Sequence, residues 1–70
     1  MLFECGEGST VKIEKIRTVD DEFKNFLFTL GCYEGELVTV ISKKKHGMVI
    51  AVKDGRYNID KDIANLIEVA

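Results

Sequence analysis

Residues 18–40 read TVDDEFKNFLFTLGCYEGELVTV, and this stretch decides the fold because it joins a helix to a strand through two glycines. The helix is predicted over residues 20–30, where apolar side chains at the i, i+3, i+4, i+7 spacing form one face that we expect to be buried: Phe23, Phe26, Leu27 and Leu30. Three acidic residues open this helix, where its dipole favours negative charge. Gly31 follows the last turn, at the position where a left-handed residue ends many helices.

Short apolar runs on both sides of this helix predict five strands. They cover residues 9–16, 36–41, 48–53, 56–59 and 66–69, and residues 1–8 are expected to be a lead-in to the first strand. The alternation in the first strand slips at Lys15-Ile16, which predicts a bulge or the end of the strand. The second strand is apolar at nearly every position, and this pattern predicts that both of its faces are covered.

Polar segments that contain glycine or aspartate separate the later runs. Residues 42–47 predict a six-residue hairpin loop, and Asp54-Gly55 predicts a type I′ turn, which needs positive φ at both central residues. Residues 60–65 predict one helical turn capped by Asp60. Because five short strands bury one core best by closing on themselves, we expect a mainly β fold. It is a five-stranded SH3-like barrel with a short α-helix between strands one and two and a helical turn before the last strand.

Composition restricts the class of protein. The 70 residues predict one domain over residues 1–70, and a hydrophobic content of 46% with 31% charged residues is typical of a folded chain. A net charge of −2 argues against a nucleic-acid binder. No run is long enough for a membrane span and no signal segment opens the chain, so we expect a cytoplasmic protein. One histidine and two serines, without an orienting group at an evident spacing, argue against an enzyme.

The residues that could bind a metal are scattered along the chain. Cys5, Cys32 and His46 belong to separate segments, and neither cysteine is part of a CxxC pair. Both cysteines are therefore expected to be small buried or half-buried thiols. We expect no cofactor and no metal site, and direct Fe(II) binding remains the alternative because Cys, His, Asp and Glu are all present.

Phe28 and Tyr33 are the predicted partner-binding residues near the helix. Phe28 lies opposite the apolar stripe, so it either anchors a partner or is covered by the N-terminal arm Leu2-Phe3. Tyr33 lies in the loop between the two glycines, where an aromatic ring with a polar end suits a contact. Cys32 is predicted to be structural, as the residue of a Schellman motif that contacts Leu27.

Lys43, Lys44 and Lys45 are the second group of predicted partner-binding residues. They occupy the tip of the expected hairpin, which could face an acidic protein partner or anionic lipid, or simply be solvated. Three lysines are fewer than the roughly four to eight of a polybasic lipid-binding segment.

The order of glycines and apolar residues resembles the FeoA domain over residues 6–69. The first half reads Gly6/Gly8-x-x-Val11-x-Ile13, then the helix, then Leu27-x-x-Leu30-Gly31-x-x-x-Gly35-x-x-Val38-x-Val40. The second half reads Gly47-x-x-x-x-Val52-x-x-x-x-Tyr57-x-Ile59-x-x-x-x-Ala64-x-x-Ile67-x-Val69. The residues expected to define the structural motif are Leu27, Leu30, Gly31, Gly35 and the turn residue Gly55.

This resemblance implies a small, non-enzymatic accessory of bacterial ferrous iron transport. Such a protein would dock on the cytoplasmic GTP-binding part of the membrane iron transporter, to aid its assembly or regulate uptake, and would meet the membrane only through that partner. The family usually has proline before its second glycine and arginines on the helix, where this chain has Glu34 and Asn25-Phe26, so a role that needs a basic helix does not carry over.

Other functions stay open. Related domains form the C-terminal module of iron-dependent repressors, but no DNA-binding helices are present, which points to the transport version. A small-barrel RNA- or ribosome-associated module is the main alternative, and a peptide-binding SH3 domain would need an aromatic groove that a chain without Trp lacks. A homodimer also remains open, because a small barrel can have free edges.

Overall fold

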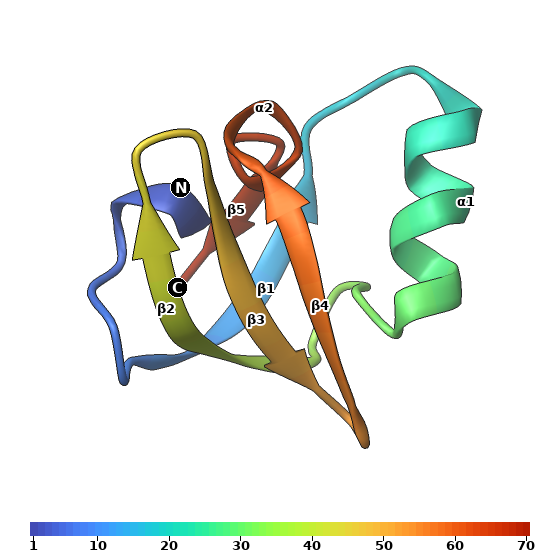
Figure 1. Ribbon diagram of the computed structural model, residues 1–70. Helices are drawn as coiled ribbons and strands as arrows, with labels where there is room; N and C mark the ends of the chain where they lie inside the picture. The colour runs from blue at the N-terminus through green and yellow to red at the C-terminus, as the bar shows by residue number, and fades with distance from the viewer.

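The computed structural model of the protein describes residues 1–70, which form five strands, two α-helices and one 3₁₀ helix (Figure 1). In chain order these are η1 (Leu2–Glu4), β1 (Thr10–Ile16), α1 (Asp21–Leu30), β2 (Leu37–Lys44), β3 (Gly47–Val52), β4 (Gly55–Asp60), α2 (Lys61–Ala64) and β5 (Ile67–Val69). No helix has the length and apolar character that a membrane crossing requires.

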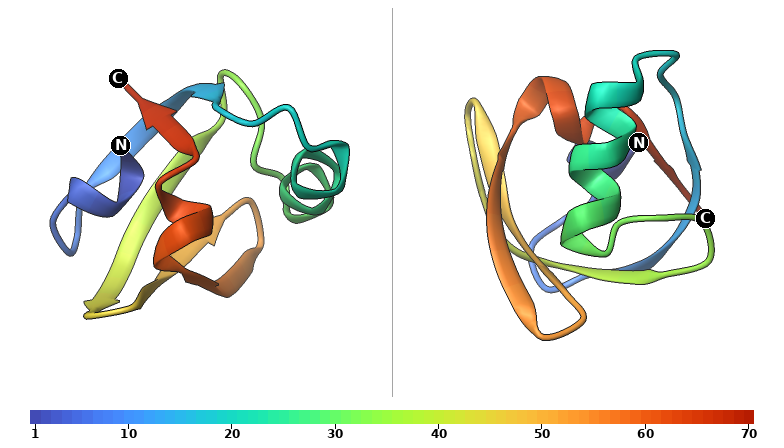
Figure 2. Two further views of the ribbon diagram at one scale, coloured as in Figure 1. Left: turned by 90° about the horizontal axis from the view of Figure 1, so that it is seen from above. Right: turned by 90° about the vertical axis from the view of Figure 1, so that its right-hand side faces the viewer.

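The strands form one antiparallel sheet in the order β4-β3-β2-β1-β5. The sheet curls around a single core, and α2 connects the two edge strands β4 and β5, which do not pair with each other (Figure 2). The predicted mainly β, SH3-like fold with a helix between β1 and β2 is confirmed. The register of β1 shifts between Ile13 and Lys15, close to the predicted slip.

The core consists of 12 apolar residues from every strand of the sheet, from both α-helices, from η1 and from the loop after α1. They are Leu2, Ile13, Leu27, Cys32, Val38, Val40, Met48, Ile50, Val52, Ile59, Ala64 and Ile67. Leu2 is fully buried, although residues 1–8 were expected to be only a lead-in. The N-terminal turn therefore completes the core.

Side-chain caps fix both helix starts, and the cap of α2 by Asp60 is the predicted one. The carboxylate of Asp20 accepts the backbone N–H of Glu22 at 2.9 Å, and that of Asp60 accepts the N–H of Ile63 at 2.8 Å. Each cap satisfies an N–H group that the first turn of a helix leaves without a partner.

The predicted burial of one whole face of α1 is wrong. Leu27 is fully buried and Leu30 is half-buried, but Phe23 and Phe26 are 41% and 43% exposed. The physical reason is the position of α1, which stands beside the sheet instead of lying on it (Figures 1 and 2). Only its C-terminal half reaches the core, so the helical period identifies an apolar stripe without identifying what covers it.

The predicted two-sided coverage of strand β2 is also wrong. Val38 and Val40 are fully buried, whereas Leu37, directly before Val38, is 57% exposed, so the strand has one inner and one outer face. The strand also continues to Lys44, and the expected six-residue loop is reduced to Lys45-His46. Lysines favour a loop in the sequence, yet Lys44 also suits a position of an antiparallel strand that faces solvent.

The turn between β3 and β4 lies one residue earlier than predicted. Val52 pairs with Gly55, so the central residues are Lys53 and Asp54, and of these only Lys53 has positive φ, at 53°. The turn is therefore not type I′. Gly55 is the first residue of β4, where a Cβ atom would collide with the phenol ring of Tyr57.

Candidate functional site

The C-terminal end of α1 is fixed by a Schellman motif. Gly31 adopts a left-handed conformation with φ 95°, its N–H donates to the carbonyl of Phe28 at 3.0 Å, and the N–H of Cys32 donates to the carbonyl of Leu27 at 2.8 Å. Cys32 and Leu27 are both buried, as this motif favours. The predicted structural role of Cys32 is confirmed, and the motif sets the position of the next residue, Tyr33.

Phe28 and Tyr33 form an aromatic pair on the surface. Their ring centroids lie 5.3 Å apart with the ring planes inclined by 40°, a separation typical of interacting aromatic rings. Phe28 is 64% exposed, and Tyr33 is half-buried. The alternative in which Leu2-Phe3 covers Phe28 is wrong, because Leu2 belongs to the core and η1 contacts α2 and β5.

Lys53 adds a positive charge to this pair. Its ammonium lies 5.1 Å from the centre of the Tyr33 ring and 3.0 Å from a carboxylate oxygen of Glu36. Hydrogen bonding with Tyr33, and then with Glu36, raises the pKa of the Lys53 side chain. Lys53 was not among the predicted site residues, because nothing about a lysine before Asp-Gly signals a positive φ at that residue. We call Phe28, Tyr33 and Lys53 the aromatic surface.

Two hollows flank the aromatic surface. One has a volume of about 410 Å³ and lies where Ile16 and Lys24 face the loop after α1. The other has a volume of about 540 Å³ and reaches Tyr57 on β4. Phe28 and Tyr33 line both hollows, so the pair forms a ridge between two depressions. An exposed ridge of this kind offers a partner both an anchor and places for its own side chains.

The three predicted lysines do not form one group. The ammonium of Lys43 donates to the backbone carbonyls of Phe3 at 3.0 Å and Cys5 at 3.2 Å, and it lies over the Phe3 ring. This direction follows from the register, because Lys43 pairs with the buried Met48 and so extends from the inner face. Lys43 therefore holds the N-terminal segment in place.

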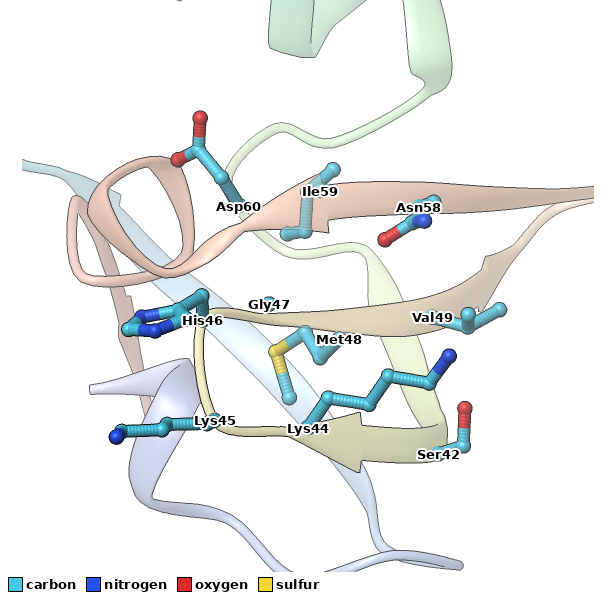
Figure 3. Close-up of a pocket in the computed structure, with 10 residues that line it drawn as sticks. All are labelled: Ser42, Lys44, Lys45, His46, Gly47, Met48, Val49, Asn58, Ile59 and Asp60. Carbon is cyan, nitrogen blue, oxygen red and sulfur yellow. The ribbon is translucent and has the colours of Figure 1, made fainter.

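Lys44 and Lys45 are exposed, and Figure 3 shows that they point in different directions. Lys44 extends along the outer face of the sheet toward Val49, and Lys45 points away beside His46 (Figure 3). A hollow of about 580 Å³ lies at this tip, between the ends of β2, β3 and β4. The tip is at the opposite end of the sheet from the turn at Lys53 (Figure 1), so the structure does not bring the two predicted partner-binding groups together.

The predicted structural glycines have separate roles. Gly31 and Gly35 both have positive φ, at 95° and 89°, and they bracket the segment that carries Tyr33. Leu27 and Leu30 attach α1 to the sheet from one end of this segment. The geometry of the loop is therefore fixed on both sides.

No group of three or more His, Cys, Asp or Glu side chains is arranged to hold a metal ion. Burial, and then the charge of Glu36, raises the pKa of the Cys32 thiol to about 11, which keeps it protonated at neutral pH. A protonated thiol is a poor metal ligand, so Cys32 suits the core and not a metal site.

Comparisons with known proteins agree with this architecture. A solved structure described as the iron uptake regulatory protein FeoA is 25% identical, with a TM-score of 0.89 over 97% of this chain and 91% of that one. An FeoA-like protein from Clostridium acetobutylicum is 18% identical, with a TM-score of 0.84 over 99% and 81% of the two chains.

A manganese-dependent transcriptional repressor shares the fold at 17% identity and a TM-score of 0.88, but the match covers 97% of this chain and only 39% of the repressor. The comparison with curated proteins gave no match. The family model described as the FeoA domain matches residues 1–70. The chain therefore belongs to the FeoA domain family.

Proposed function

We propose that this protein is a small accessory of ferrous iron transport that docks through its aromatic surface on the cytoplasmic GTP-binding part of the membrane iron transporter. Family membership supports a role in ferrous iron transport. The observation that carries the docking surface is Phe28, which is 64% exposed and packs against the tilted Tyr33 ring at a helix end fixed by hydrogen bonds. Docking would regulate uptake or aid transporter assembly without any chemistry on this chain.

Rigidity supports the docking role of this surface as much as exposure does. An apolar ring in water contributes most to binding when it is already held in its bound conformation, because little side-chain freedom is then lost. The Schellman motif, the Tyr33 ring and the Lys53–Glu36 ion pair supply that restraint. Lys53 and Tyr33 also present polar groups at the rim, which suits a partner whose contact patch is apolar at the centre and acidic at its edge.

A matched pair of variants tests this proposal. Phe28→Ser removes the anchor, and Phe26→Ser removes another exposed phenylalanine from a different side of the same helix. Binding to the purified cytoplasmic domain of the transporter is measured by calorimetry, with GTP and without it. We expect at least a tenfold loss of affinity for Phe28→Ser, which corresponds to about 1.4 kcal/mol, and little change for Phe26→Ser.

The melting temperature of each variant distinguishes docking from folding. Because both side chains are exposed, we expect melting temperatures close to that of the wild type. A folded Phe28→Ser protein that binds as well as the wild type would overturn the proposal. If the protein does not bind the transporter domain and retains RNA at moderate salt, the RNA-binding alternative would be favoured instead.

A further inference from the structure

Strand β4 forms one edge of the sheet. It pairs with β3 on one side only, and no strand covers its other side. In the right-hand view of Figure 2, where α1 faces the viewer, β4 runs beside this helix and α1 does not cross in front of it. An uncovered edge of six residues presents free backbone donors and acceptors, which favour the addition of another strand.

The turn before β4 determines which backbone groups are free. Val52 and Gly55 close a two-residue turn, so they form a hydrogen-bonded pair, and the pairs along the β3–β4 ladder then alternate. The N–H and C=O groups of Arg56, Asn58 and Asp60 therefore point away from β3. All of these groups are free except the C=O of Asp60, which is the N-cap residue of α2 and begins that helix. The side chains of the same three residues are exposed on the outer face of the sheet.

The charged side chains of β4 are complementary to those of a second, antiparallel copy of β4. Arg56 and Asp60 lie two residues on either side of Asn58 and carry opposite charges. If two copies of β4 pair antiparallel about Asn58, Arg56 of each copy lies opposite Asp60 of the partner subunit. Arg56 has no ion-pair partner within its own chain, and Asp60 uses its Oδ1 atom to cap Ile63. Opposite charges across a strand pair stabilise it, and the two-fold axis forms the contact twice.

We propose that β4 is a self-association surface, on which a second copy of this chain adds its own β4 in antiparallel register centred on Asn58. The free N–H and C=O groups of Asn58, the C=O of Arg56 and the N–H of Asp60 would then become the rungs of a new ladder that joins two sheets. A single six-residue edge buries less area than a standard interface of about 1,600 Å², so the dimer forms reversibly and depends on concentration. This surface belongs to β4 and is separate from Phe28 on α1.

Analytical ultracentrifugation of the whole chain, from about 1 μM to about 1 mM, tests this proposal. Asn58→Pro is the central variant, because it removes an outward N–H and no hydrogen bond to β3, and proline is tolerated on edge strands for that reason. Arg56→Asp places like charges opposite each other in the proposed dimer. Lys12→Asp makes the same charge change on the inner strand β1 and serves as the control.

We expect the wild type and Lys12→Asp to dimerise with rising concentration, and both β4 variants to remain monomeric with unchanged circular dichroism. A wild-type protein that is monomeric throughout the range, or a dimer that survives both β4 variants, overturns the proposal. If Asn58→Pro fails to fold, hydrogen exchange of the wild-type backbone amides tests the proposed dimer instead. The Asn58 amide of the wild type must become protected as concentration rises, and its unchanged exchange would also overturn the proposal.

Discussion

Replacing Gly31 by alanine tests how the end of α1 is held. Gly31 has φ 95° and ψ 11°, and an L-residue in the left-handed region costs roughly 1–2 kcal/mol. A Cβ atom at this position would lie 3.2 Å from Cγ of Lys53, which is tight, but the Lys53 side chain is exposed and can move. We therefore expect Gly31→Ala to lower the free energy of unfolding by about 1–2 kcal/mol. For a domain of this size the melting temperature falls by roughly 4–8 °C for each kcal/mol.

Urea denaturation followed by far-ultraviolet circular dichroism measures this loss, and Gly35→Ala is the matched control. Gly35 has nearly the same φ, at 89°, but a Cβ atom added to it would meet no other atom within 4 Å. The loss of stability in Gly35→Ala therefore comes from the backbone conformation alone. Only Gly31→Ala brings a Cβ atom against Lys53, so we expect only this variant to weaken the proposed transporter binding as well as stability.

Gly31→Asn adds a second comparison, because asparagine tolerates the left-handed region and this variant is expected to lose less stability than Gly31→Ala. A Gly31→Ala protein within about 0.5 kcal/mol of the wild type would refute the reasoning.

Three further predictions concern stability. Leu2→Ala removes a fully buried side chain, and we expect a loss of about 2–5 kcal/mol in urea denaturation; a neutral result would show that the N-terminal turn does not complete the core. Asp60→Ala removes the α2 cap and is expected to cost about 0.5–2 kcal/mol, whereas Asp62→Ala, in the same turn, serves as the control. The pKa of Cys32 is raised from 9.0 to about 11, so the fold favours the protonated thiol. The contribution of the protonated thiol to the free energy of unfolding is complete below pH 9.0 and is lost as the pH rises toward about 11. We therefore expect the difference in stability between wild type and Cys32→Ala to shrink between pH 9.0 and about 11.

The fold could be predicted because the residues that begin and end its helices act locally. Asp20 and Asp60 are polar caps at the starts of helices, and Gly31 is a glycine directly after an apolar period. Each of these residues acts on backbone groups within a few positions along the chain. Sequence alone is therefore sufficient to locate the two α-helices and the order of the strands along the chain.

The surroundings of α1 could not be predicted in the same way. Phe23 and Phe26 share a helical face with Leu27, but exposure depends on where the helix sits relative to the sheet, and the connections before and after α1 decide that. Leu2 is the converse case, since this N-terminal leucine is buried because η1 packs against α2 and β5, which are distant in the sequence. Both outcomes rest on long-range packing, which local periodicity does not contain.

The candidate site was predictable in part. Phe28 could be identified because it lies off the apolar stripe, and Tyr33 because it lies between two glycines. The cation beside them could not, because Lys53 approaches Tyr33 from the β3–β4 turn, far along the chain. The strand register likewise directs Lys43 inward toward Phe3, and a run of three lysines in sequence gives no sign of this division.

The most direct test of the docking surface is a nuclear magnetic resonance titration of the isotopically labelled protein with the unlabelled cytoplasmic domain of the iron transporter. We predict that the amide signals which shift or broaden cluster around Phe28, Tyr33 and Lys53. Changes confined to Lys44, Lys45 and His46 at the opposite tip, or no change at any residue, would contradict the proposed role of the aromatic surface.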